Sequence, residues 1–405
     1  MISRLLTCAA TAIVLTLGVA CSCGGTRDRE VVTLWHAYSG SERTALEKVA
    51  ADFNAAHKDI EIHLVSVPYD AFPDKITSAI PNGNGPDLFI FAHDRIGDWA
   101  EAQILEPIEF YVDESVADRF DTVAVTAMVF RGSLYGLPLA VKSLALFYRT
   151  DLLDKPPATT DELLAVGRKL TDRDHGRFGL AYENTKLYGH AAWLHGFGGA
   201  IFDDAGQLTI ATPEAAAALA FARELGGSQG IVPAECSTEL MATLFQEGKA
   251  AMVFSGPWFI SGLKPGVPWA VAPLPVVSAT GKPAAPYLGA EGIMMSARAH
   301  DKRAAFVVMD YLTGDASAIV RAVDARQVVP NRAAYKDDRV GKDQVLAAFR
   351  RQAEVARPMP SSPEMRMVWT PYDIAIQKVI AQGAEPAAAL ADAEREVRGY
   401  IKGAK

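Results

Sequence analysis

A carboxylate and a guanidinium are adjacent at Asp94 and Arg95, directly after the apolar run 88–92. Turn-forming residues precede this run at 82–86, so it reads as a strand buried on both faces of an α/β sheet. Ligands of open α/β sheets bind outside the carboxyl ends of the strands. A carboxylate and a guanidinium placed there can hold a polar group through bidentate hydrogen bonds. We therefore take Asp94 and Arg95 as candidate ligand-binding residues, with a surface salt bridge or a helix N-cap at Asp94 as the structural alternatives.

The rest of the chain offers no recognisable catalytic, cofactor or metal motif. His190 and His195 are five residues apart and do not share a helix face. Gly196-Phe197-Gly198-Gly199 lacks the lysine of a phosphate-binding loop, and Gly-x-Ser-x-Gly is absent. A glycosidase needs two carboxylates flanking the scissile bond, and no motif places such a pair. We expect a binding protein without cofactor or metal, and keep a secreted glycosidase as the alternative of another class.

Length and charge restrict the class of protein. A chain of 405 residues is too long for one compact core and predicts two domains. The formal net charge of -8 argues against nucleic acid or an anionic membrane surface as the partner, because both would repel an acidic protein.

The first residues are typical of an export signal. Arg4 followed by the apolar run 5–20 predicts a signal peptide over 1–20, too short for a membrane-spanning helix. Leu17-Gly18-Val19-Ala20-Cys21 resembles a bacterial lipobox, in which the cysteine receives a lipid. We therefore expect a protein of the cell envelope, periplasmic or lipid-anchored at Cys21, with a tether over 21–30; plain secretion is the alternative. Beyond Cys23 only Cys236 remains, so no internal disulfide is possible in the body of the protein.

Strands alternate with helices along the mature chain. Apolar runs at 31–35, 60–67 and 83–92 predict three strands, and runs at 178–182, 250–254 and 269–274 predict three more. Ser39 and Glu42 form a capping-box pattern at the start of one helix, and Thr212 with Pro213 predicts the start of another. This alternation predicts an α/β protein with mostly parallel sheets flanked by helices.

Several segments carry a family resemblance when they are taken together. They are Leu34-Trp35, Gly83-Asn84-Gly85-Pro86-Asp87 with Ala92-His93-Asp94-Arg95, Leu137-Pro138-Leu139-Ala140, Tyr148-Arg149-Thr150-Asp151-Leu152-Leu153, Gly256-Pro257-Trp258, and Met359-Pro360 with Trp369. The chain resembles the extracellular solute-binding proteins of ABC importers (family 1), most closely the maltose/maltodextrin-binding branch. The resemblance spans essentially the whole mature chain, and the Gly-Pro-Asp turn followed by Ala-His-Asp-Arg is its most specific part.

This resemblance implies a two-lobed periplasmic-binding-protein fold of type II that closes over a sugar by hinge motion. The N-terminal lobe would comprise 31–140 and 275–329, and the C-terminal lobe 141–274 and 330–405. Asp94 and Arg95 would bind sugar hydroxyls, while Tyr188, Trp258 and Trp369 would pack on the apolar faces of the sugar. The implied protein is the monomeric substrate-binding component of an ABC importer, which delivers a maltodextrin-like oligosaccharide to the permease subunits.

Some positions depart from that branch. Lys142 and Lys186 stand where the branch carries acidic residues, Ser39-Gly40 replaces an acidic and basic pair, and Phe91 replaces a Trp. By their positions Phe91, Lys142 and Lys186 are also candidate ligand-binding residues. Two ammonium groups in the cleft would change which sugar fits and would suit a phosphate. The segment from Trp35 to Gly40 also resembles the glycerol-phosphate-binding branch, so a receptor for an anionic ligand such as glycerol-3-phosphate is the second interpretation.

Overall fold

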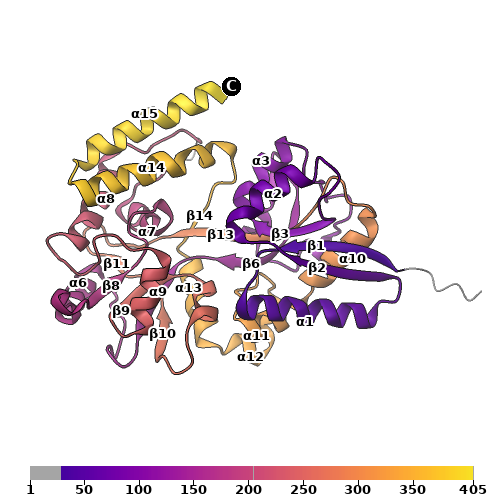
Figure 1. Cartoon of the computed structure of the whole chain (residues 1–405), viewed down its shortest axis with the longest axis horizontal. Coiled ribbons are helices and arrows are strands. Elements are labelled where there is room, and N and C mark those ends of the chain that lie inside the picture. Colours follow the sequence, from indigo (N-terminus) through magenta and orange to yellow (C-terminus); the bar gives the residue numbers. More distant parts are fainter. Residues whose placement is uncertain (1–28, 204, 405) are drawn as a thin grey trace, which may run out of the picture.

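The computed structural model describes residues 29–203 and 205–404. The predicted signal peptide 1–20, Cys21 and most of the tether 21–30 lie outside the described residues. Figure 1 shows two bodies side by side, each a sheet flanked by helices, with strands β6 and β13 at the junction between them. Within the described ranges, no helix is long and apolar enough to cross a membrane.

The first sheet contains the strands nearest the N-terminus. Strand β1 pairs in parallel with β2 and with β3, and β13 runs antiparallel to β3 and to β6. The order is β14-β13-β3-β1-β2, with β6 paired to β13 off this path. The bounds are β1 (Glu30–His36), β2 (Ile60–Ser66), β3 (Leu88–Ala92), β6 (Gly136–Lys142), β13 (Tyr287–Met295) and β14 (Arg357–Pro358). The first three predicted strands are confirmed as parallel neighbours, and β13 makes the sheet mixed.

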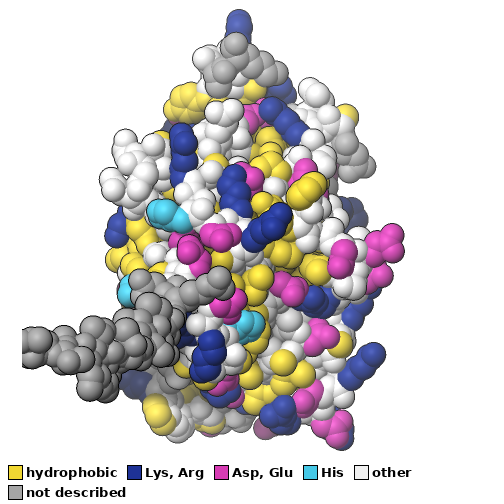
Figure 2. Space-filling model, turned by 90° about the vertical axis from the view of Figure 1, so that its right-hand side faces the viewer, with side chains coloured by type: hydrophobic (Ala, Val, Ile, Leu, Met, Phe, Trp, Pro, Cys, Tyr) yellow, Lys and Arg dark blue, Asp and Glu magenta, His cyan; other side chains and the backbone are white. Residues whose placement is uncertain are grey.

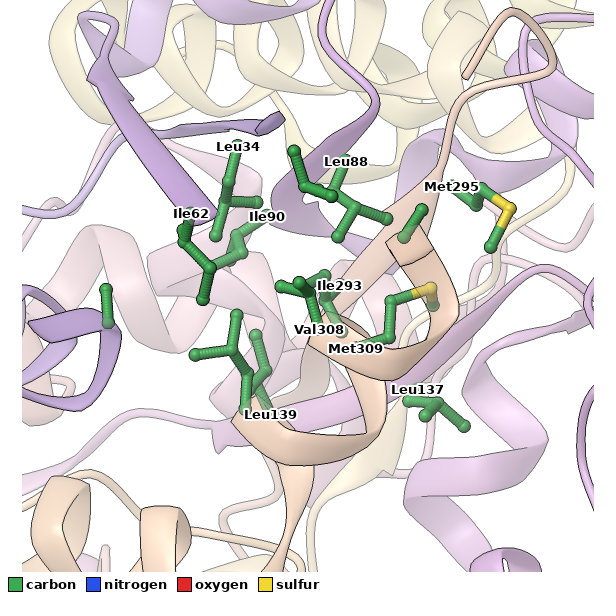
Figure 3. Packing of buried hydrophobic residues seen from close by; sticks show 14 of the residues in the cluster. Leu34, Ile62, Leu88, Ile90, Leu137, Leu139, Ile293, Met295, Val308 and Met309 are labelled. Carbon is green, nitrogen blue, oxygen red and sulfur yellow. The ribbon is translucent and has the colours of Figure 1, made fainter. Parts of the chain in front are cut away.

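Helices cover both faces of this sheet. Leu34, Ile90 and Ile293 from three adjacent strands meet Val308 and Met309 of α10 in one buried cluster (Figure 3). Each such side chain contributes about 1.5–3 kcal/mol when it leaves water. The helices are α1 (Gly40–Ala56), α2 (Phe72–Ala79), α3 (Ile96–Glu101), α4 (Glu114–Ala117), α5 (Thr122–Ala127), α10 (Lys302–Thr313) and α11 (Asp315–Ala325), with a hairpin of β4 (Val129–Phe130) and β5 (Ser133–Leu134).

Two predicted helix starts have different outcomes. Thr212 accepts a hydrogen bond from the Ala215 backbone amide at the start of α8, as predicted. The capping box at α1 is wrong, because Ser39 occupies the N-cap position but makes no side-chain capping bond. Glu42 is engaged elsewhere, by Lys142 and by Gln327. A buried cation competes for this carboxylate more effectively than a backbone amide at the helix terminus does.

The second sheet has the order β10-β7-β9-β8. Strand β8 runs parallel to β9, and β7 is antiparallel to β9 and β10. The strands are β7 (Ala145–Arg149), β8 (Phe178–Ala181), β9 (Ala250–Ser255) and β10 (Trp269–Ala272). The helices that follow or flank them are α6 (Thr160–Leu170), α7 (Leu187–Phe197), α8 (Pro213–Gly226), α9 (Thr238–Gln246), α13 (Gln344–Ala353), α14 (Pro363–Gln382) and α15 (Pro386–Ala404). This confirms the predicted α/β class. The expectation of a mostly parallel sheet is wrong here, because only β8 and β9 are parallel, while β7 enters directly from β6 and runs antiparallel to both of its neighbours.

The chain leaves the first sheet at Lys142, where β6 ends, and enters the second sheet at Ala145. It returns from β10 to β13 through the hairpin of β11 (Val276–Val277) and β12 (Lys282–Pro283), which contacts α6 and α7. By its contacts this hairpin lies with the second sheet, whereas the sequence places residues from 275 onward with the first. After β13 the chain forms α10 and α11, and the short helix α12 (Asp338–Gly341) lies between α11 and α13.

The surface at the far end of the first body carries charges of both signs. Figure 2 shows this face, which includes the right-hand end of Figure 1, with Lys and Arg side chains interspersed among Asp and Glu. No large patch of one sign gathers on the described part of that face.

Candidate ligand-binding cleft

One wall of a cleft is built by the residues that follow three parallel strands. Tyr38 comes after β1, Tyr69 after β2, and Asp94 with Arg95 after β3. Parallel strands present their carboxyl ends at one edge of a sheet, so these side chains gather there. We call this group the N-terminal wall.

The opposite wall follows the parallel strands β8 and β9. Tyr188 lies in the first turn of α7, after β8, and Trp258 lies in the 3-10 helix η4 (Pro257–Gly262), directly after β9. Their ring centroids are 6.4 Å apart, and both rings are half-buried. The nearest indole carbon of Trp258 would lie 2.1 Å from a Cβ at Gly256, so this glycine is needed for the ring to lie against the backbone. We call Tyr188 and Trp258 the C-terminal wall.

The two walls approach each other closely. A Cβ at Gly40, where α1 begins with φ of +52, would lie 2.9 Å from the Cβ of Ser261 in η4. Burial raises the pKa of Tyr188 well above its usual range, and the hydroxyl of Tyr69 and the carboxylate of Asp94 act in the same direction from the other wall. The predicted residues Asp94, Tyr188 and Trp258 thus come toward one region from the two sheets, and we take the space between them as the candidate cleft.

Asp94 and Arg95 have hydrogen-bonding capacity to spare. Arg95 Nε lies 3.9 Å from Asp94 Oδ2, too far for a hydrogen bond, and the two side chains are 30% and 22% exposed. Asp94 makes no side-chain capping bond to the helix that follows. Burial raises the pKa of Asp94, with His93 and Arg95 acting in the opposite direction. The N-cap alternative is therefore wrong, whereas the salt-bridge alternative is present as a loose ion pair between Asp94 and Arg95.

Tyr69 is a cleft residue that the sequence analysis missed. Its ring stacks on Phe91 at 4.9 Å and 25°, and Phe91 stacks on Phe72 at 4.9 Å and 14°. Phe91 is only 3% exposed, whereas Tyr69 is 56% exposed. Desolvation of the hydroxyl, together with the charges of Asp94 and Glu291, raises the pKa of Tyr69 to about 12. Tyr69 follows β2 directly, so the rule that located Asp94 would also have found it.

Lys142 does not stand alone in the cleft. Its Nζ lies 3.2 Å from Glu42 Oε1 and 3.0 Å from Glu291 Oε2, and the three side chains are at most 18% exposed. Gln327 Nε2 donates to the same Glu42 oxygen at 3.0 Å. Although burial alone lowers the pKa of Lys142, the two carboxylates raise it well above its usual range. Burial raises the pKa of Glu291, and the ammonium of Lys142 at 3.0 Å acts in the opposite direction.

Lys186 also has a carboxylate partner, at the exposed rim of the cleft. Its Nζ lies 3.1 Å from Asp373 Oδ2, and its side chain is 50% exposed. The other oxygen of Asp373 accepts a hydrogen bond from the Leu187 backbone amide at 2.7 Å. The Asp373 carboxylate therefore balances the charge of Lys186 and also stabilises the partial positive charge at the N-terminus of α7.

Trp369 lies on α14, four residues before Asp373 and thus on the same side of the helix. Its half-buried ring meets Tyr287 edge-on at 6.0 Å, and it packs with Tyr188 on one hydrophobic cluster. Trp369 therefore packs on the same hydrophobic cluster as Tyr188 of the C-terminal wall. Its aromatic partner is Tyr287.

Two other features lie apart from the cleft. Cys236 is buried, and burial raises the pKa of its thiol to about 12. A cavity of about 300 Å³ is lined by Val141, Ala290 and Met359 among others, on the face of β6 and β13 opposite Lys142. Among residues 29–203 and 205–404, no group of three or more His, Cys, Asp or Glu could hold a metal ion.

Comparison with known proteins gives consistent relatives. Residues 39–319 match the family described as bacterial extracellular solute-binding protein. The maltotriose-binding protein of Pyrococcus abyssi is 32% identical over 86% of this chain and 77% of its own length. The galactooligosaccharide-binding protein of Bacillus subtilis is 27% identical over 88% of this chain and 86% of its own length. The maltose/maltodextrin-binding domain from Bdellovibrio bacteriovorus bound to maltotriose superposes with a TM-score of 0.83 at 26% identity, over 92% of this chain and all of that domain.

Proposed function

The chain belongs to the family of bacterial extracellular solute-binding proteins, and we propose that it is the receptor of an ABC sugar importer. It captures a neutral oligosaccharide of the maltotriose class in the cleft and delivers it to a membrane permease. The predicted two-lobed periplasmic-binding-protein fold is confirmed by the likeness to the Bdellovibrio domain.

The pairing of charges in the cleft carries this proposal. Lys142 has Glu42 and Glu291, Lys186 has Asp373, and Arg95 has Asp94. No cation of the described cleft is therefore left over for a phosphate or a carboxylate ligand. A neutral polar ligand can still use the unfilled hydrogen bonds of Asp94 and Arg95 and the half-exposed rings. Sugars match such a site because they combine hydroxyls with apolar C–H faces.

Each predicted site residue receives a role. Asp94 and Arg95 bind hydroxyls from the N-terminal wall, and Tyr188 and Trp258 pack on sugar faces from the other wall. Trp369 extends this aromatic surface, while Phe91 supports the ring of Tyr69 from behind. Lys142 lies at the base of the cleft, and Lys186 at its rim adjusts ligand access.

Two other functions fit the cleft less well. An anion receptor would need an unpaired cation. A glycosidase would need one ionised and one protonated carboxyl group on either side of the bond. Glu42 and Glu291 are close together, but the ammonium of Lys142 lies in contact with both, at 3.2 and 3.0 Å, so this cation and not a glycosidic bond lies between them. Incubation with maltotriose should therefore leave the sugar uncleaved, and any turnover would contradict the proposal.

The wider organisation follows from the same proposal. The lobes correspond to the two sheets, close to the division 31–140 with 275–329 and 141–274 with 330–405, although the contacts of β11 and β12 favour a return to the first lobe near 287. Ligand would close the lobes about the segments at Lys142, Tyr287 and Gln327. A monomer anchored through Cys21 outside the cell membrane would present the sugar to its permease.

A thermal-shift screen tests the function directly. Maltotriose in large excess should raise the melting temperature by several degrees, because a ligand at 100 times its Kd stabilises the folded state by about 2.7 kcal/mol. Maltose, maltotetraose, galactooligosaccharides and glycerol-3-phosphate complete the panel.

The Asp94→Asn variant should lose that shift without changing its own melting temperature greatly. Asp338→Asn is the matched control, since this carboxylate is 79% exposed on α12. A full shift in Asp94→Asn would remove Asp94 from the site, and a shift with glycerol-3-phosphate alone would contradict the proposed function.

A further inference from the structure

Three elements bring charged side chains together at the base of the cleft. Glu42 comes from the first turn of α1, Lys142 from the end of β6, and Glu291 from the middle of β13. In the register of β6 and β13, Lys142 pairs with Gly289 and Ala140 with Glu291, so Lys142 and Glu291 point to the same face. Together with Tyr38, we call these residues the floor cluster.

The floor cluster has both donors and acceptors without partners. Among the described residues, neither the Tyr38 hydroxyl nor Glu291 Oε2 has a partner with hydrogen-bond geometry, although both atoms are buried. Tyr38 and Lys142 nevertheless lie close enough to the Glu291 carboxyl group to lower its pKa. The contact of Glu291 with Lys142 is thus an ion pair without hydrogen-bond geometry. Lys142 donates to Glu42 Oε1 and lies 3.0 Å from Glu291 Oε2, which leaves at least one of its three N–H groups for a ligand. Buried polar groups of this kind call for a bound partner, since an unmade hydrogen bond costs about 1–3 kcal/mol.

The floor cluster faces the ligand space. Lys142 Nζ lies 5.9 Å from the centroid of the Trp258 ring and 5.4 Å from that of Tyr38. A group inserted between the two walls would therefore reach the ammonium and the neighbouring carboxylate while it packs against the indole.

We propose that the floor cluster binds a hydroxyl group of the sugar and rejects anionic ligands, so that Glu42 and Glu291 determine specificity. This inference rests on the proposed function. A hydroxyl can accept from Lys142 and donate to Glu291, whereas a phosphate or carboxylate can only accept. An anion would also lie beside two carboxylates, and like charges in a desolvated site repel strongly.

Arg321 completes the charge balance from behind. It is 1% exposed and donates to the Leu139 carbonyl and to Gln327 Oε1, not toward the cleft. The cluster with Arg321 is neutral as a whole. Removing one carboxylate would give it a net positive charge, and the preference for neutral ligands should then weaken.

Calorimetry on the full mature chain tests the inference with maltotriose, maltobionate and glycerol-3-phosphate. The wild type should bind maltotriose at least about 100-fold more tightly than either anion. Glu291→Gln should bind maltotriose about 10-fold more weakly, the loss expected for one hydrogen bond to a charged group, and should gain about 10-fold for the anions. Glu247→Gln is the control, because it removes the same charge from an exposed pair with Lys249.

The fold of each variant is checked by circular dichroism and thermal melting. In Glu291→Gln, Lys142 keeps Glu42 as its partner, and Glu42→Gln serves in its place if that variant does not fold. Unchanged affinities for both kinds of ligand in a folded variant would overturn the inference. A wild type that binds no oligosaccharide would instead contradict the proposed function, so the two failures are distinguishable.

Discussion

The two lysines of the cleft look alike in the sequence but have different chemistry in the structure. Lys142 is 18% exposed and lies between two carboxylates that are each 10% exposed. Lys186 is 50% exposed at the rim and has one partner, Asp373. The first lysine is part of the interior, and the second forms a partly exposed ion pair at the rim of the candidate cleft.

This difference shows how burial changes the meaning of a charge. Exposed ion pairs contribute about 0–1 kcal/mol to stability, whereas removal of one partner from a buried pair costs about 3–5 kcal/mol. The same residue type is therefore a structural and ligand-selecting group at the floor, and a minor modifier at the rim. Four changes test this comparison.

The largest effect is expected for Lys142→Met. The substitution leaves Glu42 and Glu291 near each other without a cation, so the free energy of unfolding should fall by about 3–5 kcal/mol. Urea denaturation measures this change, and maltotriose binding should also be lost. A loss below about 1 kcal/mol would mean that Lys142 contributes no more to stability than a surface lysine, and it would contradict the comparison.

A smaller effect is expected for Gly256→Ala, which disturbs the C-terminal wall without changing any charge. The new Cβ would overlap the Trp258 ring, with 2.1–2.5 Å to three of its carbons, and must displace it. We expect a loss of about 1–3 kcal/mol in stability and weaker maltotriose binding by calorimetry. Unchanged affinity would show that the position of the Trp258 ring does not matter for the ligand.

Lys186→Met is the matched partner of the first change and should have little effect. Lys186 is 50% exposed and Asp373, which is 17% exposed, keeps its hydrogen bond from the Leu187 amide, so stability should change by about 0–1 kcal/mol. Maltotriose affinity measured in parallel should stay within a few-fold of the wild type. A stability loss as large as that of Lys142→Met would contradict the comparison.

The smallest effect concerns a third ion pair, outside the cleft. His300 Nδ1 lies 2.9 Å from Asp87 Oδ1, and Asp87 with a smaller contribution from Glu30 raises the pKa of His300. The folded pKa is raised, so this stabilisation is complete below about pH 6.5 and is lost as the pH rises through the folded value. His300→Asn should remove a small part of the stability at pH 6 and almost none at pH 9. Equal losses at both pH values would mean that the charge of His300 does not contribute.

Some parts of the site follow from sequence order alone. The strand ending in Asp94 and Arg95 and the turn before Trp258 were predicted because short-range patterns mark the carboxyl ends of strands. Tyr69 obeys the same rule but carries no charge, so it was missed. The positions of these residues are fixed by their own strands.

Other parts depend on contacts between distant segments. Glu42 looks like half of a capping box, and Glu291 lies within a strand of nine buried residues. Both glutamates pair with Lys142 over a long sequence distance. Glu42 lies 100 residues from Lys142, and Glu291 lies farther away still. Only the folded structure shows that two carboxylates pair with Lys142. For this reason the sequence alone allowed an anionic ligand as a second interpretation.

Calorimetric titration of the wild type with maltotriose at low and high salt tests the central claim most directly. A neutral ligand in a charge-balanced cleft should bind at one site with a Kd of about 1 μM or below, equivalent to about -8 kcal/mol. Its affinity should not change between low and high salt, because no net charge is exchanged. The claim would be contradicted if neutral oligosaccharides gave no saturable heat, while glycerol-3-phosphate bound with an affinity that falls as salt rises.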